Sequence, residues 1–320
     1  MLDIVDILKI DSRAAFEEAA LNVFAFQARH CEPYREYLEA IGVDPHSVQR
    51  AADIPHLPIE IFKSRKVYCT SEPHEAIFTS STTGGGLPSK HYVANLDDYR
   101  RTLRQAFTLF YGEPETWSFY ALLPCYLERQ GSSLVWMADD LIKSGGGGFF
   151  LNDLQGLVSR IAADKKRKIL LGVSYALLDL AEEYAPQLAD TIVMETGGMK
   201  GRRAELPKNE LHDILKKAFG VEKIHSEYGM TELMSQAYSV GDGIFVAPPW
   251  MRITIRDFND PFDTMQAGRR GGINVTDLAN LYSCAFIETQ DAGVVYEDGS
   301  FAVAGRMDKA QIRGCNLMVD

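Results

Sequence analysis

Residues 79–91 read Thr-Ser-Ser-Thr-Thr-Gly-Gly-Gly-Leu-Pro-Ser-Lys-His, and no other stretch of the chain is as informative. Five consecutive hydroxyl residues run into three glycines, and Lys90 follows. Hydroxyl groups can donate to phosphate oxygens, glycines let backbone N–H groups approach an anion, and a lysine adds a point charge. The spacing does not fit the P-loop pattern G-x-x-x-x-G-K-[ST], so that class is disfavoured. These residues alone leave two alternatives open, an anion-binding loop and a plain polar loop.

The composition is typical of a soluble globular protein. The chain has 320 residues, 46% of them hydrophobic and 24% charged, and a net charge of −11. That charge argues against nonspecific nucleic-acid binding, because the phosphate backbone would repel it. The five cysteines include no C-x-x-C pair, which is typical of reduced thiols in a cytoplasm. The N-terminus lacks a basic signal region and no apolar run reaches the roughly 20 residues of a membrane span, so we expect a cytoplasmic protein.

The order of hydrophobic patterns predicts an α/β fold. Helical spacing over residues 16–26 and 97–111 is followed by short apolar runs, over 118–123 and 169–173, that indicate buried strands. From about residue 240, short β-rich runs are punctuated by Gly, Pro and Asp. We therefore predict an α/β body over residues 1–240, a small β-rich subdomain over 241–304 and a short C-terminal segment over 305–320.

Several polar segments follow the predicted strands. Residues 195–202, Glu-Thr-Gly-Gly-Met-Lys-Gly-Arg, come directly after an apolar run, where open α/β sheets place ligand loops. Residues 226–232, Ser-Glu-Tyr-Gly-Met-Thr-Glu, offer an aromatic face, a glycine, a hydroxyl and a carboxylate. Asp291 ends a β-rich run, and Gly-Arg-Met-Asp follows at 305–308. Each segment by itself could be an ordinary core, turn or surface element. The order and spacing of the four segments together favour a ligand-binding site.

This order resembles the adenylate-forming superfamily of acyl-CoA synthetases, adenylation domains and luciferases. Its Thr-Ser-Gly-Thr-Thr-Gly loop followed by Pro-Lys is similar to residues 79–90, and its Tyr-Gly-x-Thr-Glu motif matches residues 228–232. The resemblance implies a large domain of α/β subdomains with a small β subdomain, a C-terminal domain reduced to a stub, and ATP and Mg²⁺ as cofactors. It also implies that the nucleotide is bound by Thr79, Ser80, Ser81, Thr82, Thr83, Gly84, Gly197, Gly198, Lys200, Tyr228, Gly229, Asp291 and Arg306.

The resemblance further implies individual roles. Tyr228 would stack on adenine and Asp291 would bind the ribose hydroxyls. Thr231 would contact the α-phosphate, and Glu232 would hold Mg²⁺. Adenylation joins a carboxylate to the α-phosphate of ATP and expels pyrophosphate, so hydroxyls, backbone N–H groups, Lys90 and a magnesium ion would neutralise the concentrated negative charge.

Residues 122–134 and 312–317 resemble one branch, the acyl-protein synthetases of bacterial bioluminescence, which are similar to phenylacetate-CoA ligases. Members of that branch activate a fatty acid as acyl-AMP, take the acyl group onto a cysteine and pass it to an acyl-CoA reductase. The resemblance assigns that cysteine to Cys315, and a thiolate is a suitable nucleophile toward a mixed anhydride. The plain alternative for Cys315 is a small buried residue near a chain end.

The chain departs from the superfamily after its Gly-Arg-x-Asp hinge, here Arg306 and Asp308. Typical members continue for a further domain that carries a lysine used in adenylation, and this sequence has only a few residues left. We expect truncation, a cation from a partner, or substitution by Lys200, Arg202 or Arg203. Two alternative functions stay open: a CoA ligase in which CoA receives the acyl group directly, and a non-catalytic nucleotide-binding scaffold.

Overall fold

One lobe of the structure is built on a mostly parallel sheet with the strand order β5-β4-β6-β7-β8-β9. The computed structural model describes residues 3–81, 86–123, 131–198, 202–204 and 206–307. Only the last pair, β8 with β9, is antiparallel. The strands are β4 (Trp117–Leu122), β5 (Gly147–Phe149), β6 (Arg167–Val173), β7 (Thr191–Thr196), β8 (His225–Tyr228) and β9 (Ala237–Ser239).

Helices cover both faces of this sheet, which is why its central strands are largely apolar and buried along almost their whole length. All six residues of β4 are buried, as are six of the seven in β6. Helix α5 contacts α6 on one face, and α8 contacts α9. The bounds are α5 (Leu96–Tyr111), α6 (Ser133–Gly145), α7 (Leu154–Ala163), α8 (Ser174–Glu183) and α9 (Lys208–Phe219), with a 3-10 turn, η3 (Pro114–Thr116), before β4.

The strand order fixes where a ligand can approach. The chain runs from β4 outward to β5, then crosses back to β6 and continues through β7 to β8. In open α/β sheets, ligands bind at the carboxyl ends of the strands, next to such a reversal. The loops that follow β4, β6, β7 and β8 therefore share one edge of the sheet.

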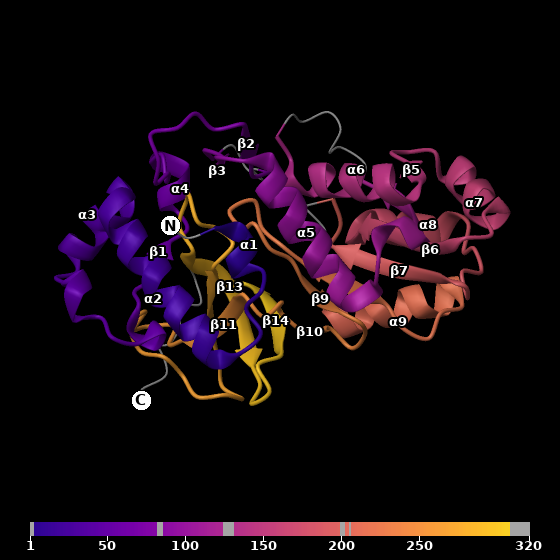
Figure 1. Cartoon of the computed structure of the whole chain (residues 1–320). Helices are drawn as coiled ribbons and strands as arrows, with labels where there is room; N and C mark the ends of the chain where they lie inside the picture. The colour runs from indigo at the N-terminus through magenta and orange to yellow at the C-terminus, as the bar shows by residue number, and fades with distance from the viewer. Residues whose placement is uncertain (1–2, 82–85, 124–130, 199–201, 205, 308–320) are drawn as a thin grey trace, which may run out of the picture.

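The second lobe holds an antiparallel sheet, β10-β14-β13-β12-β11, which a short N-terminal strand extends (Figure 1). That strand, β1 (Leu57–Pro58), pairs in parallel with β13. The others are β10 (Ile244–Phe245), β11 (Met251–Arg256), β12 (Arg270–Asp277), β13 (Phe286–Val295) and β14 (Phe301–Arg306). The N-terminal elements beside them are α1 (Ile4–Ile7), α2 (Arg13–His30), α3 (Glu32–Ala40), α4 (Ile61–Ser64), η1 (Pro45–Ser47) and η2 (Ala51–Asp53).

The N-terminal helices pack on the second sheet through aromatic rings. Phe24 of α2 and Tyr34 of α3 both contact Phe286 of β13, at centroid distances of 6.0 and 6.2 Å. Figure 1 shows α3 at one end of the molecule and α7 at the other. The predicted α/β class is confirmed. The predicted boundary at residue 240 stays a prediction, and the pairing of β1 with β13 shows that residues 57–58 lie beside the β-rich part.

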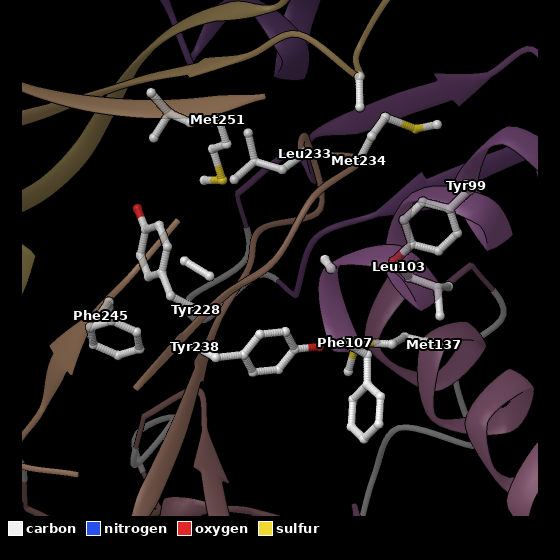
Figure 2. Close-up of a cluster of buried hydrophobic side chains, with 14 of the residues drawn as sticks. Tyr99, Leu103, Phe107, Met137, Tyr228, Leu233, Met234, Tyr238, Phe245 and Met251 are labelled. Atoms are coloured by element: carbon white, nitrogen blue, oxygen red, sulfur yellow. The ribbon is translucent and has the colours of Figure 1, made fainter. Parts of the chain in front are cut away.

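A cluster of buried side chains lies between α5 and the end of β8 (Figure 2). Phe107 of α5 meets Tyr238 of β9 edge to face, with centroids 6.3 Å apart, and Tyr228 lies on the other side of the same cluster. Aromatic pairs of this kind add about 0.5–1.5 kcal/mol each beyond the apolar area they bury. The loop after β8 therefore begins beside a well-packed part of the core.

Candidate functional site

Tyr228, the last residue of β8, joins the two lobes. Its hydroxyl donates to Asp291 Oδ2 of β13 at 3.0 Å, and its ring packs edge-on against Phe301, 5.5 Å away. Asp291 pairs with Arg306 across the β13–β14 ladder. Burial raises the pKa of the Asp291 carboxyl, while the Tyr228 hydroxyl and the Arg306 charge oppose that rise. The residues predicted to hold adenine and ribose thus lie in direct contact.

Glu232 is a buried carboxylate on the loop that follows β8, with 4% of its surface exposed. Burial raises its pKa, whereas a hydrogen bond from Ser89 and the charge of Arg306 lower it. A carboxylate in this position gains from a nearby cation. Among the described residues, no three His, Cys, Asp or Glu side chains are grouped so that they could hold a metal ion. Mg²⁺ at Glu232 would fit, because this ion is usually held by one or two carboxylates together with water and phosphate oxygens.

The hydroxyl-rich segment lies on a hairpin of β2 (Ala76–Thr79) and β3 (Lys90–Val93), in which Lys90 faces Thr79. The Thr79 N–H donates to the carbonyl of Gly131 at 2.7 Å. Ser80 and Ser89 exchange two hydrogen bonds, from the Ser80 N–H to the Ser89 carbonyl and from the Ser89 N–H to Ser80 Oγ. Both ends of the loop are therefore fixed. Ser81 is exposed, and the sites predicted at Thr82, Thr83 and Gly84 lie outside the described residues.

His91 ties this hairpin to the loop that carries Thr231 and Glu232. Its Nδ1 lies 2.9 Å from the Thr231 carbonyl oxygen and its Nε2 lies 3.0 Å from Asn280 Oδ1. The Asn280 amide in turn donates to the Glu232 carbonyl at 2.7 Å. Burial lowers the pKa of His91 to about 4, and the hydrogen bonds with Thr231 and Asn280 act against that shift. Lys90 is exposed and lies between Ser89 and His91, the two hairpin residues that contact the loop of Thr231 and Glu232.

The glycine loop after β7 rests on a buried ion pair. Gly197 has φ +68°, a conformation that favours glycine, and its carbonyl accepts from Ser174 Oγ at 3.2 Å. Glu195, two residues earlier, is 2% exposed and lies 2.5 Å from Lys208 Nζ. Burial opposes ionisation of Glu195, but the Lys208 charge, with the nearby His212 and Ser226 side chains, overcomes it and brings the pKa to about 2. The partly buried Gly198 follows in the same loop.

Replacing Lys208 with methionine is expected to lower the free energy of unfolding by about 3 kcal/mol at pH 7, because the buried Glu195 carboxylate loses its counter-charge. The matched control is the double variant Lys208→Met/Glu195→Gln, in which no charge is left unpaired and most of the stability should return. Urea unfolding of the three proteins measures the difference. Equal stability of the single and double variants would show that leaving the Glu195 carboxylate without its counter-charge costs nothing.

The cations proposed to substitute for the superfamily's C-terminal lysine differ in their surroundings. Arg203 donates to Glu182 of α8 at 2.7 and 2.8 Å and also to Asp179. Since two acids hold its charge, Arg203 is a poor candidate. The Arg202 guanidinium lies 5.1 Å from the centroid of the Tyr175 ring. Lys200 and the predicted acyl carrier Cys315 lie outside the described residues.

Sequence reasoning missed several side chains that position this site. Ser89 and His91 flank Lys90, and that adjacency was the only signal for them. Asn280 lies 189 residues from His91 and carries no motif of its own. Neither it nor Ser174 could have been found without the fold.

The chain is similar to proteins of known family and structure. Residues 8–112, which include the hydroxyl-rich loop, match the family model described as acyl-protein synthetase, LuxE. A long-chain-fatty-acid–luciferin-component ligase of Photorhabdus luminescens is 34% identical over 70 residues, 22% of this chain. The match spans 60% of that relative's length.

Solved structures agree with the fold. A 2-hydroxyisobutyryl-CoA ligase in complex with 2-HIB-AMP and CoA superposes with a TM-score of 0.72 at 15% identity, covering 94% of this chain and 70% of that one. ATP-bound MatB from Rhodopseudomonas palustris gives 0.57 at 16% identity, covering 76% and 49%. The fold implied by the resemblance to adenylate-forming enzymes is confirmed. None of the helices in the described part of the chain has the length and apolar character needed to cross a bilayer.

Proposed function

We propose that this chain activates a carboxylic acid with ATP to give an acyl-adenylate and pyrophosphate. The observation that supports it best is the meeting of two segments far apart in sequence. The hairpin that carries Lys90 is joined through His91 and Ser89 to the loop that carries Thr231 and Glu232. Cationic, hydroxyl and carboxylate groups thus gather at the carboxyl edge of a parallel sheet, where nucleotides bind in this class of fold.

The reaction needs charge stabilisation more than proton transfer. A carboxylate oxygen of the acid forms a bond to the α-phosphorus, the bond from that phosphorus to the bridging oxygen of pyrophosphate breaks, and no proton is exchanged. Lys90 and the hydroxyls of the hairpin would stabilise the charge that shifts toward the leaving group. Glu232 would hold Mg²⁺, which when bound neutralises phosphate charge. Tyr228 and Asp291 would orient adenine and ribose.

The second half of the proposal concerns the fate of the acyl group. The Cys315 thiolate would attack the carbonyl carbon of the acyl-adenylate, AMP would leave, and the resulting thioester would be passed to a partner acyl-CoA reductase in the cytoplasm. The family model matched by residues 8–112 supports this branch. The alternative, direct transfer to CoA, is favoured by the similarity to a ligase whose structure contains CoA.

An experiment with isotopically labelled acid distinguishes transfer of the acyl group to Cys315 from direct transfer to CoA. Incubation with ATP, Mg²⁺ and the acid should leave label on the protein as a thioester that hydroxylamine releases. The variant Cys315→Ser should lose that label and keep adenylate formation. Labelled acyl-CoA formed equally well by wild type and Cys315→Ser would instead establish a CoA ligase.

A further inference from the structure

Gln27, in the N-terminal helix α2, is a fully buried polar side chain that the proposed reaction does not use. Its amide Nε2 donates to the carbonyl oxygens of Asn280 and Leu281 at 2.8 and 3.0 Å, and its Oε1 accepts from the Ala285 N–H at 2.9 Å. An amide side chain offers two donor hydrogens and an acceptor oxygen. In Gln27 all of them are directed at residues 280–285, so the side chain fixes the backbone of that segment.

Asn280 carries this anchoring on to the loop after β8. Its buried side chain donates from Nδ2 to the carbonyl oxygens of Glu232 at 2.7 Å and of Cys284 at 2.9 Å. Turning the amide over would place its oxygen against both carbonyl oxygens, so these contacts select one orientation. The backbone carbonyl of the same residue is the one that Gln27 holds. The main chain at Glu232 is therefore connected to helix α2 through a single buried residue.

Residues 277–285 also hold the part of the loop that follows Glu232. The Asp277 carboxylate accepts from the Met234 N–H at 2.8 Å and from the Ser235 N–H at 2.9 Å. The side chains of Leu233 and Met234 belong to the buried cluster of Figure 2. Because the residues after Glu232 are packed and hydrogen-bonded, the placement of its carboxylate depends on the contact that Asn280 makes with its carbonyl.

The segment 280–285 has a second attachment, which does not involve Gln27. The Cys69 N–H donates to the Tyr282 carbonyl at 2.9 Å, and Ser283 Oγ donates to the Val67 carbonyl at 3.0 Å. Both partners lie in the stretch after α4, outside helix α2. Losing the Gln27 amide should therefore displace the Asn280 end of the segment without releasing the whole of it.

We propose that Gln27 is a positioning residue for the Glu232 carboxylate, acting through Asn280, and that it thereby sets how strongly Mg²⁺ promotes ATP binding. The inference rests on the proposed function, in which Glu232 holds Mg²⁺, and it gives the N-terminal helix a part in that site. Side chains that orient a metal ligand without touching the metal contribute about 10- to 100-fold to metal affinity or activity. Replacing Gln27 should therefore reduce the effect of Mg²⁺ on ATP binding about 10-fold.

The test measures the Kd of ATP by calorimetry, once with Mg²⁺ and once with a chelator, and takes the ratio of the two values. Gln27→Met removes every Gln27 hydrogen bond, and Gln27→Glu keeps the side-chain shape and the acceptor for the Ala285 N–H. Both variants should lower the ratio about 10-fold and leave the Kd without Mg²⁺ unchanged. Tyr34→Phe is the matched control, because it removes one buried hydrogen bond, from the Tyr34 hydroxyl to the Pro55 carbonyl at 2.6 Å, away from this segment. Its ratio should equal that of the wild type.

A double variant tests the route through Asn280. Gln27→Met combined with Asn280→Ser should lose no more of the ratio than Asn280→Ser alone, because Gln27 then has no contact to transmit. Additive losses, an unchanged ratio in both Gln27 variants, or an equal loss in Tyr34→Phe would overturn the inference.

ATP–pyrophosphate exchange by the same proteins separates this inference from the proposed function. A ratio that depends on Gln27 in a protein without exchange would support the positioning role and refute adenylation. Exchange by the wild type, with the same Mg²⁺ effect on ATP binding in wild type and Gln27 variants, would refute the positioning role alone.

Discussion

Glu232→Gln is expected to slow acid-dependent ATP–pyrophosphate exchange by at least about 100-fold, the loss typical of removing one group that stabilises charge in a transition state. Glutamine has nearly the shape of glutamate but lacks the negative charge with which Glu232 is proposed to hold Mg²⁺. The exchange rate should fall at saturating acid, and raising the Mg²⁺ concentration should restore part of it. Exchange in the variant within twofold of wild type at low Mg²⁺ would contradict the assigned role.

The same variant should remain folded. Glu232 is buried and its pKa is raised, so the protein loses little by losing the charge. Its backbone contact with Asn280 does not depend on the side chain. Glu222→Gln serves as the control for a change of net charge, because Glu222 is exposed. Unfolding curves for the two variants should match that of the wild type within about 1 kcal/mol.

Asp277→Ala is expected to have the largest effect on stability, a loss of about 4 kcal/mol or more in the free energy of unfolding. The Asp277 carboxylate, at the end of β12, is fully buried. It accepts four hydrogen bonds, from the Met234 N–H at 2.8 Å, the Ser235 N–H at 2.9 Å, Ser235 Oγ at 2.6 Å and the Ala279 N–H at 3.3 Å. Alanine would leave these donors buried without an acceptor.

Urea unfolding checks the prediction, and Asp277→Asn is the matched control. Asparagine keeps one carbonyl oxygen and should lose about half as much stability. Asp277 also fixes the far end of the loop that begins at Gly229, so both variants should weaken exchange even at temperatures where they stay folded. If Asp277→Ala unfolds within about 1 kcal/mol of the wild type, the carboxylate is not the anchor described.

The sequence predicted what depends on local pattern. The buried strands at 118–123 and 169–173 and the helix at 97–111 appear in the structure as β4, β6 and α5, because burial on both faces makes strands apolar and helical spacing makes one face apolar. The motifs around Lys90 and Tyr228 were readable for the same reason, since their residues are consecutive. Their proximity to each other was an expectation from resemblance alone.

What escaped prediction depends on contacts between distant residues. His91 reaches Asn280 across 189 positions, and Asp277 binds Ser235 across 42. Asp277 and Asn280 belong to no repeating pattern or motif in the sequence, so nothing there indicates that their side chains fix the site.

The most direct test of the account is ATP–pyrophosphate exchange by the wild-type chain, with Mg²⁺ and acids from aryl to long-chain. The account predicts exchange that depends on the acid, on Mg²⁺ and on Glu232. Nucleotide binding without exchange, for every acid and with the candidate reductase present, would contradict adenylation and leave a nucleotide-binding scaffold.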